Sequence, residues 1–140
     1  MSANLDLVRS IYADWERGDY SSREWAHPEI ETVIADGPNP GSWTGPGGMA
    51  ESMREHLSAW EGAWVKPEDY LELDDERVLV LTRRGGKGRR SGIELGRLRG
   101  KGASIFHVRD GKVTRQIHYF DRELALADLG LPSQAGSPRS

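Results

Sequence analysis

Apolar residues recur at helical spacing in the first half of the chain. In residues 4–18 they lie three or four apart on one helical face: Leu5, Val8, Ile11, Tyr12 and Trp15. Residues 21–27 can form a short helix, because two serines can cap it and Pro28 disfavours its continuation. Beyond Pro46 a longer helix is expected, with these residues on its apolar side: Met49, Met53, His56, Leu57, Trp60 and Trp64. The pattern therefore predicts three helices before residue 65.

The period changes to two in the second half. Strands are predicted at residues 30–36, 69–74, 77–84, 91–100, 102–108 and 113–120, and the glycine- and proline-rich residues 37–48 are predicted to be loop. A short helix follows, capped by Asp121 and ended by Gly130. Helices followed by strands predict an α+β fold, with the helices laid over a curved antiparallel or mixed sheet. We expect one domain over residues 1–131 and a flexible tail over 132–140.

Composition narrows the class of protein. The chain has 140 residues, a net charge of −3 and no cysteine, which predicts a single globular domain without disulfides or a thiolate nucleophile. The charge offers no general attraction to nucleic acid, and the absence of a long apolar run predicts no membrane span. The first residues lack a secretory signal, so a cytoplasmic location is expected. We interpret the basic run "RRGGKGRR", residues 83–90, as a solvated hairpin tip.

The hairpin "FHVRDGKVTRQIHYFD", residues 106–121, carries the most polar candidates. A two-residue turn at Asp110-Gly111 would place Val108 opposite Val113, and His107 on the face opposite Asp121. A three-residue loop, which we prefer, gathers one face for a pocket: Ile105, His107, Val113, Arg115, Ile117, Tyr119 and Asp121. The other face would carry His118, Phe106, Val108 and Phe120, and its apolar character predicts a homodimer.

The element order, with "HPEIE", "WTGPGG" and the closing "VRDGKVTRQIHYFDRELALADLGL", resembles the nuclear transport factor 2-like superfamily over residues 4–131. More narrowly, it resembles the SnoaL-like group, with its polyketide cyclases, ketosteroid isomerases and limonene epoxide hydrolases. The resemblance implies a cone-shaped α+β barrel with an apolar pocket. It also implies that Asp121 is the base and His107 its partner. Ketosteroid isomerases are matched less well: Asp36 lies near their base and Tyr12 near their oxyanion tyrosine, but their protonated acid has no counterpart.

On the residue chemistry, Arg115 would polarise a substrate oxygen. Eight residues complete the candidate substrate site: Tyr119, Ile117, Tyr12, Trp15, Asp36, His56, Trp60 and Trp64. Structural roles compete with these. Asp121 can be a helix cap, Arg115 a cross-strand ion-pair partner, and His107 or His56 a hydrogen-bonded structural histidine. Neither a metal nor a cofactor is expected.

The leading functional hypothesis is a protein that binds a small apolar ligand. It would be an isomerase, cyclase or hydrolase acting by cofactor-free acid/base chemistry on an apolar carbonyl or polyketide-like substrate. The alternative is a non-catalytic ligand-binding or dimerisation domain of the same fold.

Overall fold

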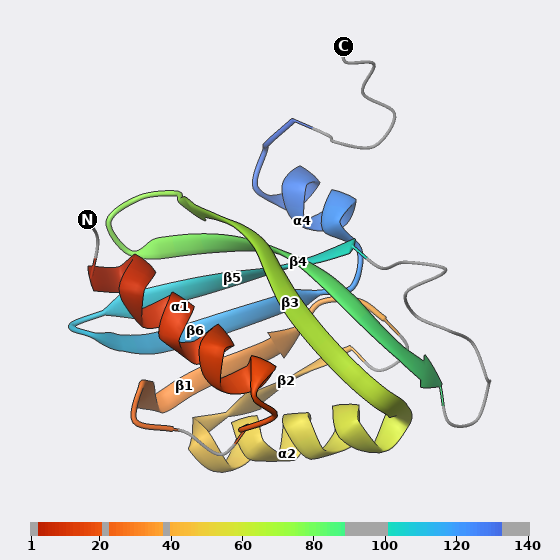
Figure 1. Cartoon of the computed structure of the whole chain (residues 1–140). Coiled ribbons are helices and arrows are strands. Elements are labelled where there is room, and N and C mark those ends of the chain that lie inside the picture. The colour runs from red at the N-terminus through yellow and green to blue at the C-terminus, as the bar shows by residue number, and fades with distance from the viewer. Residues whose placement is uncertain (1–2, 21–22, 38–39, 89–100, 133–140) are drawn as a thin grey trace.

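The structure is a computed structural model that describes residues 3–20, 23–37, 40–88 and 101–132 (Figure 1). The elements run in the order α1 (Ala3–Glu16), β1 (Ala26–Ile34), β2 (Gly41–Thr44), α2 (Gly45–Ala59), β3 (Trp60–Glu72), β4 (Arg77–Gly88), β5 (Lys101–Arg109), β6 (Lys112–Tyr119) and α4 (Arg122–Asp128). The expected α+β class is confirmed. The strand predicted at 91–100 lies outside the described residues.

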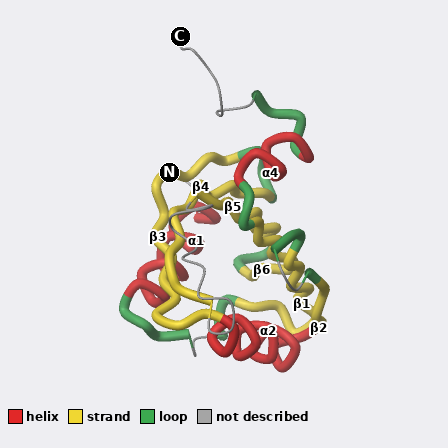
Figure 2. The backbone as a smooth tube through the Cα atoms, turned by 90° about the vertical axis from the view of Figure 1, so that its right-hand side faces the viewer, coloured by secondary structure: helices red, strands yellow, loops and turns green. Residues whose placement is uncertain are grey.

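Six strands of the described chain form one mixed sheet in the order β2-β1-β6-β5-β4-β3. The pair β1 and β6 is parallel, and every other neighbouring pair is antiparallel. The resemblance implied a cone-shaped barrel, but the sheet itself is not closed, because β2 and β3 remain as separate edges. Helix α2 contacts both edge strands and lies across the gap between them (Figure 2). Side chains from α2 and from the sheet line a common cavity.

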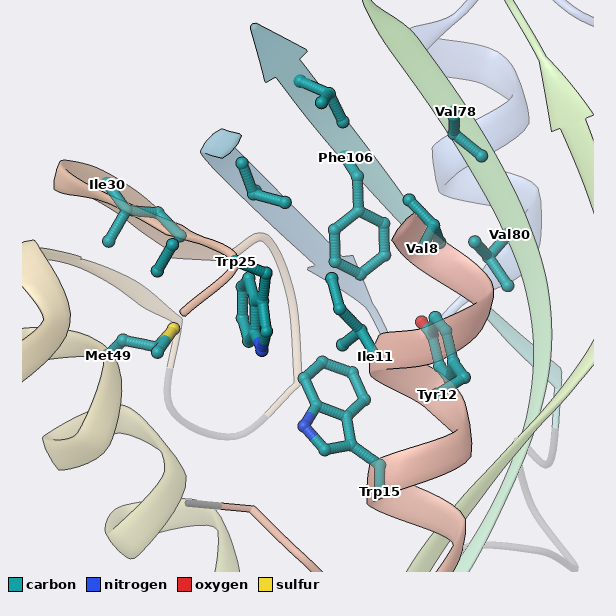
Figure 3. Packing of buried hydrophobic residues seen from close by; sticks show 13 residues of the cluster. Val8, Ile11, Tyr12, Trp15, Trp25, Ile30, Met49, Val78, Val80 and Phe106 are labelled. Carbon is teal, nitrogen blue, oxygen red and sulfur yellow. The ribbon is translucent and has the colours of Figure 1, made fainter. Parts of the chain in front are cut away.

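The helices divide the two faces of the sheet between them. Helix α1 lies on what we call the inner face, where Val8, Ile11 and Tyr12 point toward Phe106 (Figure 3). Helix α4 lies on the outer face, where Ala125 and Leu126 pack with the apolar residues Leu79, Leu81, Ala103, Ile105 and Tyr119. Alternate residues of β4 and β5 therefore serve two separate apolar clusters.

Two of the predicted helices differ from the structure. Residues 24–25 form a turn, and β1 begins at Ala26, so no helix extends to Pro28. Helix α2 ends at Ala59, and Trp60 and Trp64 belong to β3, where Trp64 pairs with Gly85 of β4. The pairing of β3 with β4 shifts register between Glu61 and Trp64, which interrupts the alternation expected of a strand. The spacing of Trp60 and Trp64 therefore resembles that of residues on a helix. Strand β2 lies within the predicted loop.

The β5–β6 hairpin has a two-residue turn, so the preferred three-residue loop is wrong. Asp110 and Gly111 have φ values of 53° and 77°, and Val108 pairs with Val113. Two positive φ values in succession are typical of a type I′ turn. A register shift follows at once, because the next pair is His107 with Arg115, which leaves Thr114 as an extra residue in β6. This bulge keeps His107, Arg115, Ile117 and Tyr119 on one face despite the shorter turn.

That shared face is the outer one, which corrects the expected position of the pocket. Tyr119 belongs to the apolar cluster under α4, and Ile117 packs against that cluster. The opposite set, expected to form a dimer interface, instead faces the interior, where Phe106 and Val108 are buried in the cluster under α1. The predicted interface is therefore already covered within the chain. The reason is that α1 packs on this face. Strand alternation predicts which residues share a face, but it does not predict which face a helix covers.

A candidate ligand-binding cavity

A partly open cavity of about 110 Å³ lies between the inner face of the sheet and α2. Its apolar and aromatic walls come from α1, α2, three strands and the adjoining loops: Trp15, Tyr20, Trp25, Ile34, Trp43, Met49, Ala50, Met53, Leu57, Ala59, Trp60, Ala63, Trp64, Val65 and Phe120. Polar side chains supply the rest: Arg23, Thr32, Ser52, Glu55, His56, Arg84, Gln116 and His118. All five tryptophans of the chain are among these lining residues. The walls are suited to a small planar molecule with few polar groups.

Arg84 is the buried cation of this cavity. It follows Val78, Val80 and Thr82 on the inward-facing positions of β4, and its side chain is only 9% exposed. Its guanidinium carbon lies 5.0 Å from the centre of the Phe120 ring, a cation–π contact worth about 2 kcal/mol when desolvated. Within the described residues, no carboxylate forms an ion pair with Arg84, and its Nε has no hydrogen-bond partner. Burying an unpaired cation costs several kcal/mol, so the cavity favours negative charge.

The interpretation of residues 83–90 as a solvated hairpin tip is therefore wrong at Arg84. Arg83 does face solvent, and lies 3.6 Å from Glu68. Because neighbouring strand residues point to opposite faces, Arg84 points inward. Gly85 follows, where an added Cβ would come within 2.2 Å of the Trp64 ring. Glycine is thus required for the tryptophan to lie across β4.

A chain of hydrogen bonds orders the polar wall formed by β5, β6 and β1. Ser104 Oγ lies 2.7 Å from His118 Nδ1, and His118 Nε2 lies 2.9 Å from Gln116 Oε1. Gln116 Nε2 then donates to Thr32 Oγ1 at 3.1 Å. Since Gln116 Oε1 can only accept, His118 carries its proton on Nε2 and accepts from Ser104 at Nδ1. Burial, with a smaller contribution from Arg84, lowers the pKa of His118 to about 3. This ring is neutral and engaged at both nitrogens.

His56 presents a second neutral imidazole to the same cavity. It comes from the last turn of α2, and its ring centre lies 6.0 Å from that of Phe120. Burial and then the charge of Arg84 lower the pKa of His56 to about 4. Among the described residues, no hydrogen bond uses its ring nitrogens. His56 can therefore accept a proton or hydrogen bond from a molecule in the cavity.

The residues expected to perform the chemistry lie elsewhere. Arg115 Nε is 3.0 Å from Glu31 Oε1 across β1 and β6, the cross-strand ion pair that competed with its catalytic role. His107 sits beside Arg115 on the outer face, and burial followed by the charge of Arg115 lowers its pKa. Asp121 caps α4 by accepting a hydrogen bond from Glu123 N at 3.0 Å. None of these three is among the residues that line the described cavity.

Three of the substrate-site candidates also lie outside the cavity lining. Tyr119 donates its hydroxyl to Asp128 Oδ2 at 2.9 Å, and Ile117 is a neighbour of the outer-face cluster. Asp36 accepts from the backbone amides of Phe120 and Asp121, at 2.6 and 3.0 Å. These carboxylate contacts join the end of β1 to the start of α4. Tyr119 and Ile117 lie outside the lining because the sheet presents its opposite face to the cavity, and Asp36 lies outside it beyond the end of β1.

The other candidates lie at or beside the cavity. Trp15, His56, Trp60 and Trp64 contribute to its lining. Tyr12 is fully buried next to it, with its ring centre 5.0 Å from that of Trp15, and burial raises its pKa to about 12. Tyr12 is therefore part of the core that supports the wall.

Sequence reasoning missed Arg84, Gln116 and His118 as cavity residues. The signal for Arg84 was present, since alternation from the apolar positions of "RVLVLTRR" places it with Val78 and Val80. For Gln116 and His118 of β6, periodicity predicted that both side chains share one face of the strand. It did not determine whether that face is the inner or the outer one. Across the described ranges, no group of three histidine, aspartate or glutamate side chains is arranged to hold a metal. No described helix has the length and apolar character required to cross a bilayer.

Comparison with known proteins agrees with this fold. A crystal structure of a nuclear transport factor 2-like protein of unknown function from Burkholderia pseudomallei superposes with a TM-score of 0.69 at 19% identity, covering 91% of this chain and 97% of that one. A protein of ketosteroid isomerase-like fold from Catenulispora acidiphila, in complex with trimethylamine, gives 0.63 at 15% identity, covering 91% and 94%. TerC, co-crystallised with polyporic acid, gives 0.67 at 25% identity, covering 91% and 98%.

No curated protein matches the chain in sequence. The family model of the SnoaL-like domain, however, matches residues 8–116, which extend from α1 into β6 and include Arg84 and His56. The match covers well over half of the chain. This protein belongs to the SnoaL-like domain family.

Proposed function

We propose that the protein binds a small, planar, mainly apolar molecule in the cavity and transfers a proton on it without a cofactor. The observation that carries this proposal is the pairing of a neutral, unpartnered His56 with the buried cation Arg84 inside aromatic walls. A proton acceptor and a cation facing one desolvated space are the two groups that carbonyl chemistry of this kind requires.

In the proposed reaction, His56 removes a proton from a carbon next to a carbonyl group. The electron pair moves onto the carbonyl oxygen, where Arg84 stabilises the developing charge. His56 then returns the proton at another position or to the original one. The imidazole begins neutral because burial and Arg84 hold its pKa at about 4. His118 has both nitrogens engaged, so it orients the wall and takes no part in the transfer.

The relatives support the ligand class in outline. TerC was crystallised with polyporic acid, and the Catenulispora acidiphila protein with trimethylamine. Both are small organic molecules, as is the ligand that we propose. The volume of about 110 Å³ admits one aromatic ring, and a larger ligand would extend through the open side of the cavity.

The test has a binding part and a chemical part. Aromatic ketones such as acetophenone and 1-indanone should shift the indole N–H signals in ¹H–¹⁵N spectra, because the five tryptophans line the cavity. In D₂O, the protein should catalyse deuterium incorporation next to their carbonyl groups. His56→Gln should slow this exchange by about 100-fold or more. His27→Gln, which changes a histidine outside the cavity lining, is the control.

Unchanged indole signals across such a panel would contradict ligand binding. Binding without catalysed exchange would instead favour the non-catalytic member of the family. Equal exchange rates in the wild type and His56→Gln would remove His56 as the base.

A further inference from the structure

The cavity contains a buried cation, Arg84, whose charge is not balanced by a paired anion among the described residues. Arg23 and Glu55 are exposed lining residues of opposite charge, while Arg84 is buried behind them. His56 and His118 are both neutral at pH 7, because burial lowers the pKa of each. Asp36 attracts Arg84 electrostatically, but its two carboxylate oxygens are bound to the amides of Phe120 and Asp121. The interior therefore carries one positive charge without a paired anion among the described residues.

The geometry of Arg84 determines which end of the guanidinium is available. The Nε atom is fully buried and lies against the backbone of β5, since a Cβ added to Gly102 would come within 3.1 Å of it. The stem of the side chain is thus held in the sheet. Because Arg84 lines the cavity, its Nη1 and Nη2 end faces the open space. Two parallel N–H donors are matched by the two oxygens of a carboxylate.

Resting on the binding part of the proposed function, we infer that the cavity also accepts a small aromatic carboxylic acid, with its carboxylate on the Nη atoms of Arg84 and its ring between the tryptophans. Because Arg84 is then occupied, such an acid competes with the carbonyl substrate for the site. One buried cation is neutralised by a ligand with a single negative charge. A phosphate ester, with its greater charge, would require further cations, and the described lining supplies beyond Arg84 only the exposed Arg23, which Glu55 opposes. The bound carboxylate also removes the unpaired charge that acts on His56.

Matched probes test this inference. Benzoate and benzamide have nearly the same shape, and trans-cinnamate and trans-cinnamamide form a second, longer pair. Titration of the wild-type protein at pH 7, followed through the indole N–H signals, should show at least tenfold tighter binding of each acid than of its amide. Arg84→Met should abolish this preference. Arg83→Met, which removes the same charge at the neighbouring, outward-facing position, should preserve it.

A second measurement does not depend on the variants. Saturating benzoate should raise the pKa of His56, followed by ¹H–¹³C spectra of its ring, because the anion cancels the repulsion from Arg84. Benzamide should leave that titration unchanged.

The possible outcomes distinguish a failure of the carboxylate inference from a failure of the proposed ligand-binding function. If benzamide shifts the indole signals and binds as tightly as benzoate, the carboxylate inference is wrong and ligand binding stands. If Arg84→Met keeps the preference for acids, Arg84 is not the anion site. If neither member of either pair perturbs the tryptophans, the proposed binding function itself is contradicted.

Discussion

His118 Nδ1 lies 2.7 Å from Ser104 Oγ, on the face of the sheet that looks into the cavity. This contact, with Gln116 on the other ring nitrogen, fixes His118 as the neutral Nε2–H tautomer. Long-range ¹H–¹⁵N spectra at pH 6 should show that tautomer. An imidazolium pattern at this pH would contradict the arrangement.

The same contact predicts how stability depends on pH. Unfolding raises the pKa of His118 from about 3 to its ordinary 6.5, so the unfolded chain takes up a proton between these values. Stability is therefore fully present above about pH 6.5 and falls as the pH decreases toward 3. At pH 5 the loss from this residue is about 1–2 kcal/mol relative to pH 7.5. Urea denaturation of the wild type and His118→Gln at both pH values measures it, and an equal pH difference in the two proteins would refute it.

Arg122 joins the final helix to the sheet. Its side chain is only 6% exposed and donates hydrogen bonds to Gly102 O at 3.1 Å, Thr82 O at 2.7 Å and Glu68 Oε1 at 2.6 Å. Arg122→Met leaves two buried carbonyls without this donor, so we expect a loss of about 2–3 kcal/mol. Glu68→Gln removes the partly exposed partner alone and should cost about 1 kcal/mol or less. Thermal denaturation compares them, and similar losses would show that the carbonyl contacts contribute little.

Asp36 and Asp121 allow a comparison of structural carboxylates. Asp36 accepts from two backbone amides, and Asp121 from Glu123 N. Asp36→Ala should therefore cost about 2 kcal/mol, and Asp121→Ala about 1 kcal/mol. Asp121→Asn should retain most of the stability, because asparagine is also a good N-cap. Affinity for the ligands above should not change in Asp121→Asn, and a tenfold loss would place Asp121 in the site after all.

Gly85 and Trp64 form a pair that a double-mutant cycle can test. A Cβ at Gly85 would come within 2.2 Å of the Trp64 ring, which is 44% exposed and lines the cavity. Gly85→Ala should displace the ring, shift its indole signal and lower ligand affinity. In a Trp64→Ala background the same change should have little effect, since the clash is absent. Equal effects of Gly85→Ala in both backgrounds would exclude the proposed contact.

Local sequence determined much of the architecture. The apolar spacing of Leu5 to Trp15 defined α1, and the alternation of "RVLVLT" and "GASIFHV" defined most of β4 and β5. Asp121 was identified as a possible helix cap and is one. These elements follow from interactions between residues close in the chain, which periodicity records directly.

The boundaries between neighbouring helices and strands were harder to predict from the sequence. Trp60 and Trp64 continued the helical spacing of α2, yet pairing with β4 places them in β3. The turn at Asp110-Gly111 was one of two possibilities, and the bulge at Thr114 restored a register that turn length alone would have changed. Long-range pairing decides such boundaries, because the backbone hydrogen bonds of a strand are made with distant residues.

By itself, the sequence determined which side chains of β6 lie together: Arg115, Ile117 and Tyr119 on one face, Gln116 and His118 on the other. The tertiary structure decided which face encloses the cavity. Helix α1 covers the inner face and α4 the outer face, so His118 lies inside and His107 outside. The physical reason is that alternation fixes side chains relative to their own strand, whereas the interior is defined by the helices that pack on the sheet.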